Sequence, residues 1–186
     1  MHRKLSIAQV LVLLGLFAAT SAGAAVFMKI SDIKGESTDT TDHDHEGWIV
    51  VESLSTSMNV APSRAGTGTG ATRRRSDAIV EDVSLTKHVD KASAKLAEAV
   101  CKGETIPKVE IHVTASYTDA GRQTYYKYEL TNVMVTSYSV SNSGGSERPV
   151  ENITLNFGEV KVTYDQQGMK SKGNVETEYK VGKGEK

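Results

Sequence analysis

Cysteine is nearly absent from this sequence. Among 186 residues the only cysteine is Cys101, so a disulfide within the chain is impossible. A chain of this length buries about 70% of the surface that its unfolded form exposes, so it needs neither disulfides nor a structural metal to hold a core. Cys101 falls in a predicted helix, where a lone thiol is more often a small buried hydrophobe than a reactive group. We therefore predict one soluble domain with an ordinary apolar core.

Motifs for catalysis are also missing. The sequence contains no G-x-S-x-G, no H-E-x-x-H, no phosphate-binding glycine loop and no Cys/His pairing suited to nucleophilic catalysis. The string GTGTG lacks the preceding strand and the following helix of a dinucleotide site. His88 and His112 stand alone in the sequence. We expect a protein that is not an enzyme and that uses no cofactor.

A strong excess of one charge is absent as well. Lysine and arginine number 22 and the acidic residues 23, for a net charge of −1. Removal of a leader that carries Arg3 and Lys4 leaves 22 − 2 = 20 basic against 23 acidic residues, or −3. No basic field then remains to attract nucleic acid or an acidic membrane. Nucleic acid is not an expected partner.

Long apolar runs are confined to the N-terminus. The positive start MHRK is followed by LSIAQVLVLLGLFAAT and by an A-x-A site that ends at Ala24. This order is typical of a secretory signal peptide, Met1–Ala24, cleaved between Ala24 and Ala25. A membrane anchor is the alternative, but the apolar part is shorter than the ~20 residues of a spanning helix and no stop-transfer pattern follows. We predict a secreted or periplasmic chain without stable membrane insertion after cleavage.

Alternating hydrophobicity marks the strands. The stretch 108–117 places Val109, Ile111 and Val113 on one face and His112 and Thr114 on the other, which is the period of a half-buried antiparallel strand. The other predicted strands are AVFMKI, GWIVVESL, AIVEDVSLT, YYKYELTNVMVTSYSV and VENITLNFGEVKVTY.

One helix is predicted, at about 90–102. Asp90 or Ser93 can cap its N-terminus, and Gly103 is suited to end it. Its expected inner face consists of Leu96, Ala99 and Val100.

The strand at 150–164 changes its inward parity half-way along. Ile153, Leu155 and Phe157 share one parity, whereas Val160, Val162 and Tyr164 share the other, with Gly158 at the change. The strand at 125–140 makes a similar change. A β-bulge at each change, with Gly158 in one of them, explains both, because a bulge adds one residue and increases the twist of a strand. The predicted fold class is mainly β, an antiparallel β-barrel with one flanking α-helix.

Two stretches have no apolar rhythm. Residues 55–77 are rich in Gly, Ser, Thr and Arg, which predicts a long, mobile loop of the kind that is either functional or disordered. Arg73, Arg74 and Arg75 could bind a phosphate or an acidic partner there, but charges in a flexible loop are more often solvated. Residues 165–186 form a polar, glycine-rich tail that we expect to be disordered or ordered only against a neighbouring subunit.

The stretch Asp42 to Glu46, DHDHE, is the only cluster of metal-ligand types. In an extended conformation His43 and His45 would project to the same side and could share a cation. A four-coordinate site needs further ligands, and no downstream partner is obvious. The favoured interpretation is a hydrated turn before the strand at Trp48, and we expect no metal.

Three extended blocks resemble a known family in their order and spacing. They are FMKISDIKGESTD, DVSLTKHVDKASAKLAEAVCKGETIPKVEIHV and ELTNVMVTSYSVSNSGGSERPVENITLNFGEVKVTY. Together they are similar to the Hcp family of type VI secretion tube proteins over about 26–164, which is nearly all of the expected barrel domain, 25–164.

The resemblance implies a barrel of two curled antiparallel sheets flanked by a helix, and assembly into a homo-hexameric ring. Such rings stack into a hollow tube that a contracting sheath drives out of the cell, with effectors attached to its tip or carried in its lumen. The partners it implies are thus other copies of the chain, effector proteins, and sheath or tip components. It also implies that the loop at 55–77 reaches a neighbour, with these residues as candidate contacts: Ser63, Arg64, Arg73, Arg74 and Arg75.

The leader departs from the family pattern, because ordinary subunits are assembled in the cytoplasm without a cleaved signal. An exported protein that forms rings or acts as a carrier outside the cytoplasm, independently of a contractile apparatus, is therefore an alternative. A start at Met28 would restore an ordinary tube subunit, but it would remove Val26 and Phe27 from the first predicted strand.

Overall fold

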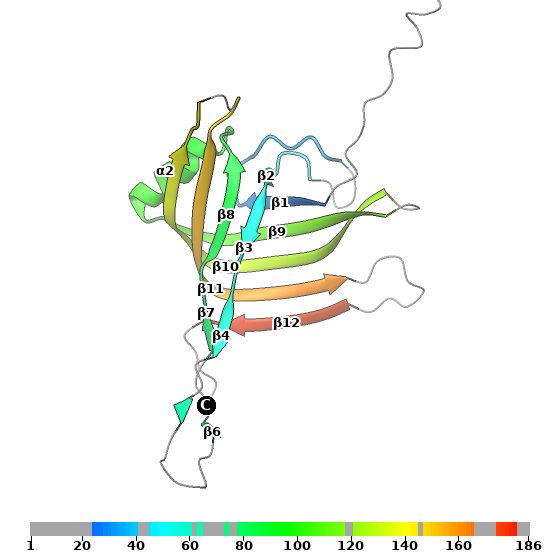
Figure 1. Cartoon of the computed structure of the whole chain (residues 1–186), viewed down its shortest axis with the longest axis vertical. Coiled ribbons are helices and arrows are strands. Elements are labelled where there is room, and N and C mark those ends of the chain that lie inside the picture. Colours follow the sequence, from blue (N-terminus) through cyan, green and yellow to red (C-terminus); the bar gives the residue numbers. More distant parts are fainter. Residues whose placement is uncertain are drawn as a thin grey trace, which may run out of the picture.

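The protein folds mainly as antiparallel β-structure with one helix (Figure 1). The computed structural model describes residues 24–40, 45–60, 63–64, 73–74, 78–117, 121–144, 147–165 and 174–181. Every predicted strand is present within these ranges, which confirms the predicted fold class. The elements are β1 (Ala25–Ile30), β2 (Ile49–Val51), β3 (Ser53–Ser55), β4 (Met58–Val60), β5 (Ser63–Arg64), β6 (Arg73–Arg74), β7 (Ala78–Val80), β8 (Val83–His88), α2 (Ser93–Lys102), β9 (Thr105–Tyr117), β10 (Gly121–Ser141), β11 (Val150–Asp165) and β12 (Asn174–Lys180).

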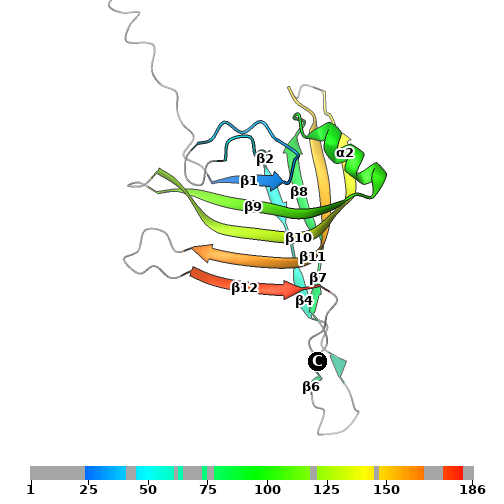
Figure 2. The same cartoon turned by 180° about the vertical axis from the view of Figure 1, so that it is seen from behind.

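The main sheet has eight strands and curls into a nearly closed barrel. Its order is β2-β1-β9-β10-β11-β8-β3, and β12 pairs with β11 beyond the stretch that pairs with β8. The two ends of this order meet, because β2 and β3 are separated only by Glu52, whose N–H donates to the carbonyl of Thr86 in β8 over 2.8 Å. Figure 2 shows the curl from behind.

The change of parity seen in the sequence lies along a line across three neighbouring strands. Asn132 in β10 lies opposite Gly158 in β11 and Pro107 in β9, since the pairs on either side of it are in continuous register. A Cβ on Gly158 would lie 3.0 Å from the Asn132 side-chain nitrogen, and Asn132 has a positive φ of 55°. The buried residues on either side of this line are Ile106 and Val109 in β9, Leu130 and Val133 in β10, and Phe157 and Val160 in β11.

The predicted bulge at Gly158 is therefore wrong, although the change of face is real. The three strands change face together, so their pairing stays in register and the sheet folds along the line. Two register shifts do occur in β10, at Tyr125 against β9 and at Thr136 against β11. Both lie away from the line and increase the curl of the longest strand.

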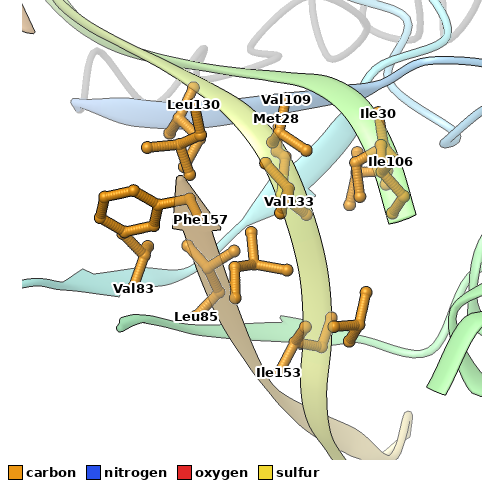
Figure 3. Packing of buried hydrophobic residues seen from close by; sticks show 14 of the residues in the cluster. Met28, Ile30, Val83, Leu85, Ile106, Val109, Leu130, Val133, Ile153 and Phe157 are labelled. Atoms are coloured by element: carbon orange, nitrogen blue, oxygen red, sulfur yellow. The ribbon is translucent and has the colours of Figure 1, made fainter. Parts of the chain in front are cut away.

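The inward faces of the strands form one apolar core with α2 (Figure 3). Leu96 and Ala99 of the helix are buried in this core, whereas Val100 is only partly buried against it. Gly103 ends the helix in the left-handed conformation, with φ 61°, as predicted. Cys101 is exposed, so its expected burial is wrong, because it lies on the outer side of the helix.

A charged network lies beneath the start of α2. The side chains of Lys87 and Glu151 are fully buried, and their Nζ and Oε2 atoms are 2.6 Å apart. The Lys87 ammonium also lies 2.8 Å from Asp90 Oδ1, and Tyr138 donates its hydroxyl to Glu151 over 2.6 Å. Asp90 in turn accepts the N–H of Ala92, which fixes the entry to the helix. The network joins β8, β10, β11 and α2.

The predicted disorder of the tail is wrong for Asn174–Lys180. These residues form β12, which extends the sheet of the same chain through seven register pairs with β11, from Glu159↔Lys180 to Asp165↔Asn174. Val175, Thr177 and Tyr179 alternate with polar residues along the strand. The prediction missed this alternation because it is short and lies among glycines and lysines.

Candidate assembly surface

A two-stranded ribbon projects from the barrel where a mobile loop was predicted (Figure 1). β4 pairs with β7, and farther along the ribbon β5 pairs with β6. The prediction of an irregular loop over 55–77 is thus wrong for these short strands, because paired backbone needs no long apolar pattern. The ribbon is tied to the barrel through the Tyr179 hydroxyl, which donates to the carbonyl of Ala78 over 3.1 Å.

The base of the ribbon exposes apolar side chains on both faces. Met58 and Val60 are 52% and 57% exposed, and Ile79 on the opposite strand is 55% exposed. Met58 and Val60 share one face, whereas Ile79 pairs with Asn59 and lies on the other. Clustered exposed hydrocarbon of this kind is typical of a surface that contacts another protein.

The residues predicted as loop contacts lie farther along the ribbon. The backbone register places Ser63 opposite Arg74 and Arg64 opposite Arg73. Arg75 lies outside the described residues. The structure thus brings four of the five predicted residues together in one pair of strands, but sequence reasoning missed Met58, Val60 and Ile79. The sequence could have indicated these three residues, because they are hydrophobic side chains within or beside a polar stretch.

A second exposed apolar group lies at the far ends of β10, β11 and β12. Tyr126, Tyr164 and Val175 are successive partners across these strands. Tyr164 is 43% exposed and Val175 is 66% exposed. Tyr126 also packs against Tyr128, at 5.1 Å between ring centroids, and burial raises the pKa of Tyr128 to about 12. Tyrosine is enriched at protein interfaces because its ring buries much area at small entropic cost.

The opposite face of the same strands is charged. In β9, Nζ of Lys108 lies 2.8 Å from Oε1 of Glu110. The same Nζ lies 3.1 Å from Oε2 of Glu129 in β10. Two further ion pairs on this face join β11 to β12, between Lys161 and Glu176 and between Lys180 and Glu159. In β10, β11 and β12 the charged side chains therefore lie on one face and the apolar side chains on the other.

The histidines are not arranged as the sequence suggested. The prediction that His45 lies in a hydrated turn is wrong, because His45 is fully buried. Its Nε2 lies 3.0 Å from Nδ1 of His112, for which the sequence indicated no partner. Nε2 of His88 lies 2.7 Å from Oε1 of Glu52. His43 lies outside the described residues, and within the described part of the chain no group of three or more metal-ligating side chains comes together.

The predicted cleavage site lies at the start of the barrel. Ala24 is exposed, and β1 begins at Ala25, whose N–H and carbonyl both bond to the hydroxyl of Thr114. A chain that began at Met28 would lack three residues of β1, among them the buried Phe27. Among the described residues, no helix is long and apolar enough to span a membrane.

The fold belongs to the class of nearly closed antiparallel β-barrels with one packed helix, here with a projecting ribbon. A family model described as "Type VI secretion system effector, Hcp" matches residues 27–164. Protein hcp1 of Pseudomonas aeruginosa is 34% identical over 145 residues, which cover 76% of this chain and 83% of that protein. The chain belongs to the Hcp family, which is a family of structural tube proteins rather than of enzymes.

Solved structures agree with this assignment. One titled "Structure of a type six secretion system protein" has a TM-score of 0.72 at 26% identity, over 84% of this chain and 95% of the other. Hcp1 from Salmonella typhimurium has a TM-score of 0.67 at 26% identity, over 85% of this chain and 95% of that protein. The fold and the family were therefore both predicted correctly from the sequence.

Proposed function

We propose that this protein is a tube subunit that assembles into hexameric rings, and that these rings stack into a hollow tube of a type VI secretion system that carries or delivers effectors. The family match over 27–164 supports the ring-forming role. The observation that carries it is the base of the ribbon, β4 and β7, where Met58, Val60 and Ile79 are each more than half exposed, as is typical of a surface that another protein covers.

The two exposed apolar groups are of different kinds, which favours a head-to-tail contact. The ribbon presents Met58, Val60 and Ile79, and the sheet end presents Tyr164 and Val175. A contact between two unlike surfaces repeats around an axis and closes a ring when the rotation is suitable, whereas like surfaces pair as a two-fold dimer. The number of subunits in the ring, six, is the number that the resemblance to the Hcp family implies, and we expect neither nucleic acid nor a cofactor as a partner.

The oligomeric state of the purified mature chain tests this function. We expect native mass spectrometry at micromolar concentration to show a species of six subunits, and electron microscopy at higher concentration to show ring-shaped particles that stack. A chain that stays monomeric throughout that range would contradict the proposal. Sheath and tip components are the further partners of such a tube, and they are tested only once rings exist.

A second candidate function is that of an exported Hcp-like ring or carrier that acts without a contractile apparatus. The predicted leader, Met1–Ala24, favours it, because cleavage at Ala24/Ala25 leaves a mature chain that begins at the first residue of β1. The alternative start at Met28 removes backbone that pairs with both β2 and β9. Export therefore leaves the barrel whole, whereas the later start does not.

Replacement of Leu11, Leu13, Leu14 and Leu16 with charged residues tests export. The change removes the apolar segment that the secretory machinery reads and leaves the barrel untouched. We expect the altered protein to remain uncleaved in the cytoplasm, and the unaltered protein to appear in the periplasm or medium with Ala25 as its first residue. N-terminal sequencing that finds Met1 retained on cytoplasmic protein would support an ordinary tube subunit instead.

A further inference from the structure

The predicted cleavage site has no spacer between the leader and the folded barrel. β1 begins at Ala25, directly after the bond between Ala24 and Ala25 that the proposed export requires to be cut. Ala24 is exposed, whereas Phe27 and Met28 are 3% and 0% exposed. The chain thus passes from the predicted scissile bond into the barrel wall within three residues.

The amide group of the predicted scissile bond is itself bonded within the sheet. The N–H of Ala25 donates to the hydroxyl of Thr114 in β9 over 3.3 Å, and the same hydroxyl donates to the carbonyl of Ala25 over 2.9 Å. Thr114 is fully buried, so its hydroxyl is shielded from solvent. The backbone on the C-terminal side of the predicted cut is therefore held from its first residue.

Both edges of β1 are occupied directly after this first residue. Residues 26–28 pair with β2 on one side and with β9 on the other. A protease holds the residues around the bond that it cuts as an extended strand, and the enzyme pairs its own backbone with an edge of that strand. In the folded barrel β1 offers no free edge at residues 26–28. A peptidase can therefore engage Ala25 and Val26 only after the start of β1 has left the sheet.

Given the proposed export, we propose that folding of the barrel masks its own cleavage site, so that a signal peptidase cuts the chain only before β1 pairs with β2 and β9. The cut is a hydrolysis, in which water adds across the Ala24–Ala25 peptide bond and leaves a carboxyl group on Ala24 and an amino group on Ala25. Translocation, hydrolysis and pairing of β1 must then follow in this order. A chain that folds first keeps its leader.

The full-length precursor tests this order. It is unfolded in urea and diluted into detergent micelles, and a bacterial signal peptidase is added either at once or after refolding. Intact mass reports the loss of residues 1–24, and the fluorescence of Trp48, the only tryptophan, reports folding. We expect the refolded precursor to be cut at least about tenfold more slowly than the freshly diluted precursor, because each cut must wait until β1 opens. Resistance to the peptidase should appear at the same rate as the change in fluorescence.

Two variants change the mask without changing the leader. Insertion of Ser-Gly-Ser-Gly between Ala24 and Ala25 places the scissile bond about 13 Å from β1, at about 3.3 Å per residue, and the folded variant should be cut as fast as its freshly diluted form. Thr114→Val removes the hydroxyl that holds Ala25, and the folded variant should be cut about fivefold faster than the folded wild type, which corresponds to one hydrogen bond. Thr86→Val is the matched control and should leave the rate unchanged, because the hydroxyl of Thr86 bonds to Asn152 instead of β1.

The outcomes separate the mask from the export on which it rests. Equal rates for the folded and the freshly diluted precursor would overturn the mask and leave the proposed export intact. A freshly diluted precursor that is not cut after Ala24 would contradict the export, and the mask with it. If Thr114→Val fails to fold, the insertion variant decides, because it keeps every residue of the barrel. A folded insertion variant that resists the peptidase as well as the folded wild type does would contradict masking by β1.

Discussion

The barrel end beneath α2 buries charge, whereas the ribbon at β4–β7 exposes hydrocarbon. Lys87 and Glu151 are fully buried at the first, and Met58, Val60 and Ile79 are each more than half exposed at the second. Each region thus reverses the usual distribution of polar and apolar residues. Hydrogen bonds within the subunit explain the first reversal, whereas the proposed function explains the second by a contact with another subunit.

Beneath α2 the cause is hydrogen bonding within the subunit. A buried ion pair is tolerated only when its remaining polar atoms also find partners. Lys87 meets this condition through Glu151, Asp90 and the carbonyl of His88, and Tyr138 completes the shell of Glu151. Among the described residues, no contact covers the apolar side chains of the ribbon to the same extent, and the proposed function assigns their cover to another subunit.

The largest expected effect is that of Glu151→Gln. The substitution removes the negative charge that lies closest to the buried Lys87, and breaking such a pair typically costs about 3 kcal/mol or more. We expect a fall of about 3 kcal/mol in the free energy of unfolding, measured by urea denaturation at pH 7. Glu98→Gln is the control, because Glu98 pairs with Lys95 and Lys102 on the exposed side of the helix, and its midpoint should not change.

The pH dependence sharpens this prediction. Burial acts to raise the pKa of Glu151, but hydrogen bonds from Lys87 and Tyr138 outweigh it and hold the pKa below its ordinary value of 4.5. A carboxyl group with a lowered folded-state pKa stabilises the fold above its unfolded pKa and loses this contribution as the pH falls. The difference between wild type and Glu151→Gln should therefore be constant above pH 5 and shrink below about 4.5. A difference that grows toward low pH would contradict this assignment.

The next largest effect is that of Leu96→Ala. Leu96 is fully buried between α2 and the sheet, and truncation of a buried leucine typically costs about 2–5 kcal/mol through lost transfer energy and a residual cavity. We expect a value toward the lower end, because the single helix can shift toward the sheet. Ile79→Ala is the matched control on the ribbon and should change the free energy of unfolding by less than about 0.5 kcal/mol. If Leu96→Ala and Ile79→Ala lowered the free energy of unfolding by similar amounts, the proposed difference between the core beneath α2 and the ribbon would be wrong.

The sequence predicted the strands well because one face of each strand packs on the core. Ile153, Leu155 and Phe157 alternate with polar residues and are buried as expected. The same rule failed for His112 and Thr114, which were assigned to solvent on the outer face of β9. Both are buried there, His112 beneath the segment that ends in Trp48, and no alternation within β9 can indicate what covers its second face.

The change of face at Gly158 shows a second limit. A bulge in one strand and a fold across the whole sheet produce the same parity change in the sequence of that strand. Only the register of the neighbouring strands distinguishes a bulge from a fold. Pro107, Asn132 and Gly158 lie far apart in the sequence, and their alignment follows from the register of β9, β10 and β11. The charged network could not be predicted from the sequence for the same reason, because Lys87 and Glu151 come together only when β8 pairs with β11.

Shortening the ribbon is expected to have a small effect on stability and the largest effect on assembly. Replacing residues 61–77 with an Asn-Gly turn leaves β4 and β7 joined, and the entropy of closing a shorter loop changes the free energy of unfolding by less than about 1 kcal/mol. We expect the shortened protein to keep the unfolding midpoint of the wild type but to form shorter stacks or none in electron micrographs. Because the barrel and the sheet end are intact, single rings should persist in native mass spectrometry. Stacks of unchanged length would show that the outer ribbon makes no contact between rings, and they would leave the proposed contact within the ring, at Met58, Val60 and Ile79, unaffected.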